Sequence, residues 1–266
     1  MEPLDNNINN LTQDGNIRHV EINLDALALC LNHAFSSESE EVLGLLIGQI
    51  DESQRKAIIK STLPLTRSNT NSECVEFLSD HFIVGGIHTA KLSKKSGESM
   101  LVIGWYHSHP RKAVWPTTAD VERQAQYQCV EPSFFGLIFS VYNGSCTIDT
   151  MNICCFQTFK QNPDTVKRRC IDVTIQPTKF NFYNLEGYIY LPQLLWEERL
   201  KAYIEPSNEE LDTFEILEKD SSTTVELINI MNAITRPLLW SLEERLKITK
   251  MRVRQLRGLR NFLEQI

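Results

Sequence analysis

The stretch of sequence that decides the fold reads Met100-Leu-Val-Ile-Gly-Trp-Tyr-His-Ser-His-Pro110 and continues through Arg-Lys-Ala-Val-Trp-Pro-Thr-Thr-Ala to Asp120. Its first half is apolar and contains β-branched residues, which predicts a buried strand that ends at the proline. Side chains alternate between the two faces of a strand, so His107 and His109 project from the same face at its end. Ser108 points to the opposite face and is expected to be structural or to support a ligand residue. The two imidazoles can therefore converge on one point.

Asp120 supplies a third candidate ligand for a metal ion at that point. It lies eleven residues after His109 and opens a polar helical run. Two histidines and a carboxylate are three protein ligands, and a tetrahedral zinc with three protein ligands keeps its fourth position for water, as in catalytic sites. The spacing alone leaves two alternatives open. Histidines at a strand end are often ordinary core or surface residues, and an acidic residue in a first helical turn can simply cap the helix.

This array closely resembles the JAMM signature of the MPN+ zinc metalloproteases, in which a remote upstream glutamate precedes an apolar run. Glu41-Val-Leu-Gly-Leu-Leu-Ile-Gly48 looks like that upstream element, and the family's order continues with His107, His109, Thr117 and Asp120. Further stretches resemble the BRCC-type subunits, the lysine-63-linkage-specific deubiquitinases of BRISC and related DNA-damage complexes. These stretches are residues 30–34, 104–110, 114–116 and 136–140. The resemblance covers most of the chain.

The resemblance implies an α/β fold, in which an MPN domain with a central mixed sheet flanked by helices is followed by a C-terminal helical, coiled-coil region. It implies one Zn²⁺ per chain, held by His107, His109 and Asp120, and hydrolysis of isopeptide bonds in lysine-63-linked ubiquitin chains. Glu41 is then the general base toward the attacking water. Thr117 stands where the family usually has serine. It keeps the hydroxyl that would stabilise the oxyanion, and its added methyl group leaves altered activity open.

The resemblance also implies a partner, because the related subunits pair through C-terminal helices with an MPN− pseudoenzyme, as a heterodimer or a dimer of heterodimers. In this chain a heptad seam is formed by Leu239, Leu242, Leu246, Thr249, Val253, Leu256, Arg260 and Leu263. A seam this short, with two polar members, needs a partner helix, and an amphipathic helix packed on its own core is the alternative. A second function therefore stays open, an MPN scaffold subunit that is inactive unless it is paired.

The composition is that of an ordinary globular protein. The 266 residues, 42% hydrophobic and 23% charged, are enough for one good-sized domain with an appendage. The net charge of −7 argues against direct binding of nucleic acid through the bulk surface. Seven cysteines at irregular positions, without a Cys-x-x-Cys pair, indicate reduced thiols. With neither a signal-peptide pattern nor a long apolar stretch, an intracellular protein without membrane contact is expected, cytoplasmic and nuclear.

Hydrophobic periodicity and turn residues predict the remaining elements. Strands are predicted at residues 17–22, 42–50, 56–63 and 134–140, with a hairpin to 145–159 across Asn143-Gly144 and a strand pair at 173–191. Helices are predicted at 23–34, 79–92 and 191–204 and from 224 onward, with a loop at 93–97 and a break or kink at Pro237. The predicted domains are a flexible leader at 1–16, the MPN+ catalytic domain with its extension at 17–205 and a helical partner-binding region at 206–266.

Overall fold

The computed structural model describes residues 16–67, 79–142, 152–162, 165–177, 184–204 and 212–264. The chain divides into two compact units, one that ends at Leu194 and one that begins at Leu195. The predicted leader at 1–16 lies, apart from Asn16, outside the described residues. The predicted boundary at 205/206 also falls outside them, so the predicted domain limits stay predictions.

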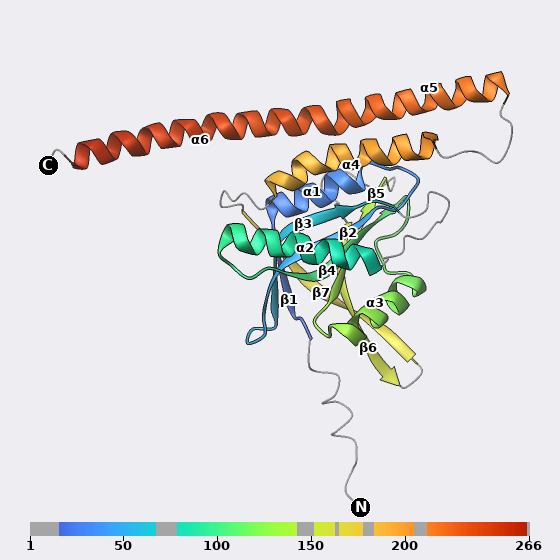
Figure 1. The fold of residues 1–266 in the computed structure, drawn as a ribbon. Helices are drawn as coiled ribbons and strands as arrows, with labels where there is room; N and C mark the ends of the chain where they lie inside the picture. Colours follow the sequence, from blue (N-terminus) through green and yellow to red (C-terminus); the bar gives the residue numbers. More distant parts are fainter. Residues whose placement is uncertain are drawn as a thin grey trace, which may run out of the picture. The chain divides into compact units, whose positions relative to one another are not determined.

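A mixed sheet forms the centre of the first unit (Figure 1). In the described residues it has seven strands: β1 (His19–Asn23), β2 (Leu43–Asp51), β3 (Lys56–Leu65), β4 (Leu101–Pro110), β5 (Phe135–Val141), β6 (Asn152–Asn162) and β7 (Thr165–Gln176). They close into a barrel in the order β1-β3-β2-β4-β5-β6-β7. β1 runs parallel to β3 and β7, and β4 runs parallel to β5, whereas the other neighbours are antiparallel. The predicted mixed sheet is confirmed. The first and last strands in its order, β1 and β7, pair with each other, so the sheet has no open edge.

Strand β4, which carries the two histidines, is buried on both faces. It pairs with β2 on one side and with β5 on the other. Ile103 and Tyr106 belong to the main core cluster, whereas Trp105 belongs to a second cluster on the opposite face. A strand covered on both faces reads as a continuous apolar run, which explains its sequence. The predicted strand is confirmed, and it extends through both histidines to Pro110.

Among the described residues, three helices flank this sheet: α1 (Leu24–Ala34), α2 (Ser79–Ser96) and α3 (Thr118–Val130) (Figure 1). The helix predicted at 23–34 is confirmed as α1. The helix predicted from residue 79 is confirmed as α2, but the loop predicted at 93–97 is wrong because α2 continues to Ser96. The Ser93 hydroxyl donates to the carbonyl oxygen of Thr89 at 2.8 Å and accepts from the N–H of Met100 at 2.9 Å. The polar residues that resemble a loop thus belong to the helix, and Ser93 joins its last turns to the segment before the next strand.

The segment after β7 differs from its prediction. The strand pair predicted at 173–191 is wrong, since β7 is one strand that ends at Gln176 and the helix α4 (Leu185–Ile204) follows. The Tyr188 hydroxyl donates to the carbonyl oxygen of Asp25 at 2.8 Å, which holds the start of α4 against α1. The aromatic and β-branched residues at this point have strand propensity, and tertiary packing overrides it. The turn predicted at Asn143-Gly144 lies outside the described residues, while the antiparallel pairing of β5 with β6 is confirmed.

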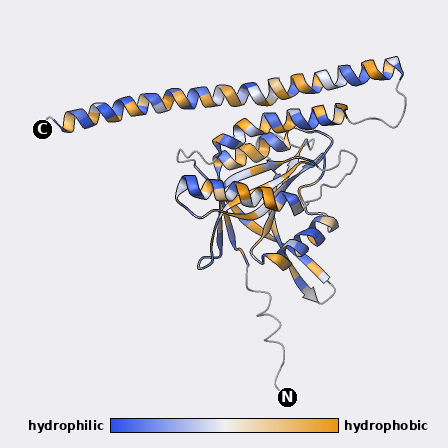
Figure 2. Ribbon diagram, viewed as in Figure 1, coloured by the Kyte–Doolittle hydropathy of each residue, from blue (hydrophilic) through white to orange (hydrophobic). Residues whose placement is uncertain are grey.

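The second unit is helical. It contains α5 (Thr213–Asn229), a π-helical segment (Ile230–Thr235) and α6 (Arg236–Leu263). The break predicted at Pro237 is wrong, because α5, the π-helical segment and α6 follow one another without interruption. The winding changes from π to α just before this proline, which has no N–H for a helical bond. Hydrophobic residues recur along α6 (Figure 2). The seam residues Leu246 and Leu256 are 54% and 65% exposed.

The cysteines of the described residues are free thiols: Cys30, Cys129, Cys154, Cys155 and Cys170. Burial raises the pKa of the Cys30 thiol far above its ordinary value, so this side chain stays protonated in the core. Among the described helices, none combines the length and the apolar character that crossing a membrane would need.

Candidate active site

The end of β4 brings the two predicted histidine ligands together. Their Nε2 atoms are 3.0 Å apart, and His107 and His109 are 2% and 1% exposed. The Nδ1 atom of His109 lies 2.8 Å from the carbonyl oxygen of Ala113. Because a carbonyl only accepts hydrogen bonds, Nδ1 of His109 carries the proton, and the Nε2 of its neutral form presents a lone pair to the site. The predicted convergence of the two imidazoles is confirmed.

Asp120 completes this group from the first turn of α3. Its Oδ1 lies 3.3 Å from Nε2 of His107, and its Oδ2 lies 3.4 Å from Nε2 of His109. Asp120 also caps the helix: its carboxylate accepts from the N–H of Thr117 at 2.8 Å, and its own N–H donates to the Thr117 hydroxyl at 3.3 Å. Asp120 therefore caps the helix, which was the alternative left open by the sequence, and it also lies where a metal ligand would be.

The three groups fit a tetrahedral metal ion. One ligand atom from each residue lies within 4.8 Å of the other two. Zinc bonds of about 2.0–2.1 Å at the tetrahedral angle separate neighbouring ligand atoms by about 3.3 Å. The two Nε2 atoms are 3.0 Å apart, and each lies at a similar distance from one oxygen of the Asp120 carboxylate, 3.3 Å from Oδ1 for His107 and 3.4 Å from Oδ2 for His109. Two Nε2 lone pairs this close repel each other unless a proton or a cation lies between them. The donor set and its spacing therefore suit zinc.

Burial and hydrogen bonding set the charges of the group. Burial disfavours the ionised form of Asp120, but the hydrogen bonds from His107 and His109 outweigh it and hold the pKa of Asp120 well below its usual range. Burial lowers the pKa of His107, and the hydrogen bond to Asp120 offsets only part of this effect. Burial also opposes the charged form of His109, yet its bonds to Asp120 and Ala113 raise its pKa overall. An ionised carboxylate beside a neutral His107 is the protonation state that binds a cation.

Glu41 lies beside this group because of the pairing of β2 with β4. The two strands are antiparallel, and at the start of β2 the Ser108 N–H donates to the Val42 carbonyl oxygen at 3.0 Å. The Val42 N–H in turn donates to the Ser108 hydroxyl oxygen at 2.9 Å, so Ser108 is structural as predicted. Glu41 directly precedes Val42 and therefore lies next to the part of β4 that carries the two histidines. Its side chain is 8% exposed, and its charge acts on both imidazoles.

The Thr117 hydroxyl lies at the rim of the same group. It donates a hydrogen bond to Oδ2 of Asp120 at 2.7 Å. The hydroxyl predicted to stabilise the oxyanion is thus close to the metal-binding group, but in this structure it is bonded to the carboxylate. Its role in catalysis stays a prediction.

Two residues that support the site, Gln124 and Lys112, were not predicted from the sequence. The Trp105 ring stacks on His107 with the ring centres 4.6 Å apart, and its indole N–H donates to Gln124 at 2.7 Å. Gln124 therefore holds the tryptophan that supports a ligand, and its position one helical turn after Asp120 was the available signal. The second missed residue is Lys112, whose Nζ lies 3.1 Å from Oε1 of Glu41. The basic pair that directly follows the histidine strand was its signal.

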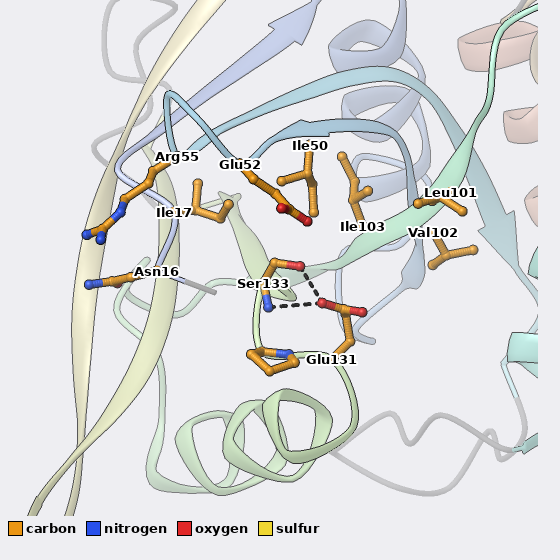
Figure 3. A pocket seen from close by; sticks show the side chains of 11 residues that line it. Asn16, Ile17, Ile50, Glu52, Arg55, Leu101, Val102, Ile103, Glu131 and Ser133 are labelled. Atoms are coloured by element: carbon orange, nitrogen blue, oxygen red, sulfur yellow. Dashed lines mark hydrogen bonds between the residues drawn. The ribbon is translucent and has the colours of Figure 1, made fainter. Parts of the chain in front are cut away.

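A cavity of about 560 Å³ lies elsewhere in the first unit, around the start of β4 (Figure 3). It is lined by Asn16, Ile17, Ile50, Glu52, Arg55, Leu101, Val102, Ile103, Glu131, Pro132 and Ser133. The polar group of Glu131 is bonded locally, since Ser133 donates to it from its N–H at 3.2 Å and from its hydroxyl at 2.5 Å. The predicted site residues do not line this cavity. The candidate active site is the buried group at the other end of β4.

The chain matches two known families. Residues 15–133 match the JAB1/Mov34/MPN/PAD-1 ubiquitin protease family, and residues 184–262 match the BRCC36 C-terminal helical domain. A solution structure, protein DSY2949 from Desulfitobacterium hafniense, is 19% identical with a TM-score of 0.43, over 60% of this chain and 94% of that chain.

Individual relatives cover nearly the whole length. The chain is 35% identical to the Lys-63-specific deubiquitinase BRCC36 of Xenopus laevis, over 91% of this chain and 94% of that one. It is 32% identical to the Lys-63-specific deubiquitinase BRCC36-like of Mus musculus, over 90% and 92% of the two chains. The resemblance predicted from the sequence is confirmed: the chain belongs to the JAB1/Mov34/MPN/PAD-1 ubiquitin protease family, in its BRCC36 branch.

Proposed function

We propose that this chain is a zinc-dependent deubiquitinase that hydrolyses isopeptide bonds in lysine-63-linked ubiquitin chains. The observation that carries the proposal is the convergence of His107, His109 and Asp120, with the carboxylate of Glu41 beside them. Such an arrangement provides a metal site and a proton acceptor together. The relatives, which are Lys-63-specific deubiquitinases by name, support the substrate class.

The roles of the residues follow from their positions. His107, His109 and Asp120 would hold the zinc, which when bound polarises the scissile carbonyl and lowers the pKa of water. Glu41 removes the proton of the attacking water and delivers it to the lysine nitrogen as the C–N bond breaks, so the amine leaves as a neutral group. Thr117 would donate to the oxyanion, which requires its hydroxyl to turn away from Asp120.

The exposed seam of α6 supports a proposal about assembly. Seam residues such as Leu246 and Leu256 are more than half exposed, and a row of exposed apolar residues at heptad spacing is typical of a helix that pairs with another. We propose an MPN− pseudoenzyme as the partner and the cytoplasm and nucleus as the location, as the family resemblance implies. The same seam favours the second candidate function, an MPN scaffold subunit that is inactive until it is paired.

The proposed function is tested with a panel of linkage-defined diubiquitins. Each is incubated with the purified chain alone and with the chain reconstituted with an MPN− pseudoenzyme, and bound zinc is measured in the same samples. We expect selective cleavage of the lysine-63 linkage by the zinc-loaded pair. If the reconstituted pair cleaves and the unpaired chain does not, the partner is necessary for activity. A zinc-loaded pair that cleaves none of the panel would contradict the proposal.

A further inference from the structure

Two loops meet beside the candidate active site. The acidic loop (residues 36–41) follows α1 and ends at Glu41, and the basic turn (residues 111–113) follows β4. Two ion pairs join them: Arg111 with Glu38 at 2.5 Å, and Lys112 with Glu41 at 3.1 Å. The two pairs differ in the solvent exposure of their side chains. One is an ordinary surface contact, and the other involves a buried carboxylate of the proposed site.

The pair between Arg111 and Glu38 is an ordinary surface ion pair. Its two side chains are 65% and 58% exposed. Water and salt screen such pairs strongly, and many of them contribute nothing measurable to stability. We therefore assign it no part in the reaction, which makes Arg111 a suitable control for its neighbour.

The pair between Lys112 and Glu41 involves a buried carboxylate. The Glu41 side chain is 8% exposed, and the Lys112 side chain reaches it from the solvent side with 49% exposure. A buried carboxylate needs a partner to offset the loss of its hydration. Lys112 bonds to Oε1, and within the described residues no other hydrogen bond to this carboxylate is found. The second carboxylate oxygen is therefore left for a proton.

The backbone of the basic turn is fixed, so Lys112 approaches Glu41 from a defined point. Arg111 has φ of 56°, a left-handed conformation, and its N–H donates to the carbonyl oxygen of Val141 at 2.8 Å. The buried Ser140 hydroxyl donates to the carbonyl oxygen of Lys112 at 2.6 Å. The next carbonyl, that of Ala113, accepts from the ligand His109. The turn that fixes a metal ligand thus also carries the lysine that reaches the base.

We propose that Lys112 is a positioning residue for Glu41. Its ammonium group holds one carboxylate oxygen, which restricts the rotation of the glutamate and directs the other oxygen toward the attacking water. This inference rests on the proposed role of Glu41 as the general base. Correct orientation of a catalytic group governs the rate of the chemical step more than the binding of substrate. The opposite reading is that the Lys112 ammonium blocks the base by occupying the position of a departing lysine, and the two readings predict opposite changes in rate.

The test uses the zinc-loaded chain with its partner, in whichever state cleaves lysine-63-linked diubiquitin. kcat, KM and zinc content are compared for wild type, Lys112→Ala, Lys112→Arg, Arg111→Ala and Glu41→Gln. Lys112→Ala should lower kcat by about tenfold and leave KM and zinc content unchanged, since only orientation is lost. Lys112→Arg keeps a cation within reach and should recover most of the rate. Arg111→Ala should leave kcat near the wild-type value.

The outcomes separate this inference from the proposed function. An unchanged or increased kcat in Lys112→Ala overturns the positioning role, while loss of activity in Glu41→Gln would leave the proposed base in place. A decrease that Lys112→Arg does not restore, or that Arg111→Ala reproduces, also overturns it, because it would report a disturbed turn. If Glu41→Gln retains full activity, Glu41 is not the general base of the proposed function. The positioning role of Lys112 is then rejected as well.

Discussion

The hydroxyl oxygen of Ser108 accepts a hydrogen bond from the backbone N–H of Val42 at 2.9 Å. Ser108 lies between the two histidine ligands, and Val42 follows the proposed base, so this bond joins the strand of the ligands to the segment of the base. The side chain of Ser108 is fully buried. One hydroxyl thus links two parts of the site that are far apart in the sequence.

Replacing Ser108 with alanine should lower the activity without lowering the zinc content. Ser108→Ala leaves the Val42 N–H buried without its acceptor, which should cost about 1–3 kcal/mol of unfolding free energy. Activity should decrease because the segment before β2 shifts, while the zinc content stays the same because both histidines remain. Denaturant unfolding, zinc analysis and diubiquitin cleavage check these results. A variant with full stability and full activity would contradict the linking role.

The stability of the apoprotein should depend on the protonation of His33. Burial, with a contribution from Arg67, lowers the pKa of His33 to about 3 from an ordinary value of 6.5. The unfolded chain therefore binds this proton more readily than the folded chain between these pH values. Stability should be fully present above the unfolded pKa and should fall as the pH decreases below it, by about 1.4 kcal/mol per pH unit from this residue.

The variant His33→Asn removes this titration and provides the comparison. Between pH 6.5 and 4.5 it should lose about 2.3 kcal/mol less unfolding free energy than the wild type, whatever its stability at neutral pH. Denaturant unfolding is measured at each pH with a chelator present, so that loss of metal affects neither protein. Equal slopes for the two proteins would show that His33 is not buried as a neutral group.

Zinc binding should be visible as thermal stabilisation that depends on the carboxylate of Asp120. A ligand that binds only the folded state stabilises it by about 2.7 kcal/mol at a free concentration of one hundred times its Kd. The wild-type melting temperature should rise on addition of zinc and fall on chelation. Asp120→Asn keeps the shape of the side chain but not its charge, and it should show a much smaller shift. An identical shift in both proteins would place the bound zinc elsewhere.

The seam on α6 should mediate assembly without supporting the fold of this chain. Leu246→Asp with Leu256→Asp introduces charges at two exposed seam positions and should abolish binding of the partner, while circular dichroism stays unchanged. The matched control is Met251→Asp with Phe262→Asp, also exposed but on the opposite face of the helix. The control should bind normally. Equal loss of binding in both double variants would reject the seam.

The sequence predicted the centre of the site well because its geometry is local. The convergence of His107 and His109 follows from the period of a strand, and Asp120 follows from the first turn of the next helix. The proximity of Glu41 was predicted by family resemblance, and the structure gives its physical reason in the pairing of β2 with β4.

Other features depend on contacts that no local pattern contains. The parallel pairing of β1 with β7 joins distant segments. The helix α4 was predicted in part as strand, since packing against α1 decides its conformation. Lys112, which contacts Glu41, follows Arg111, whose left-handed backbone the sequence does not predict because arginine rarely adopts it.

The most direct test of the account compares wild type with Glu41→Gln, each loaded with zinc and assembled with its partner, for cleavage of lysine-63-linked diubiquitin. The glutamine keeps the size of the side chain and removes its ability to accept and return a proton. Both proteins should contain one zinc per chain, and the variant should be slower by about 10²–10⁴-fold, the usual contribution of a general base. A variant that contains the same zinc and cleaves at the wild-type rate would contradict the central claim.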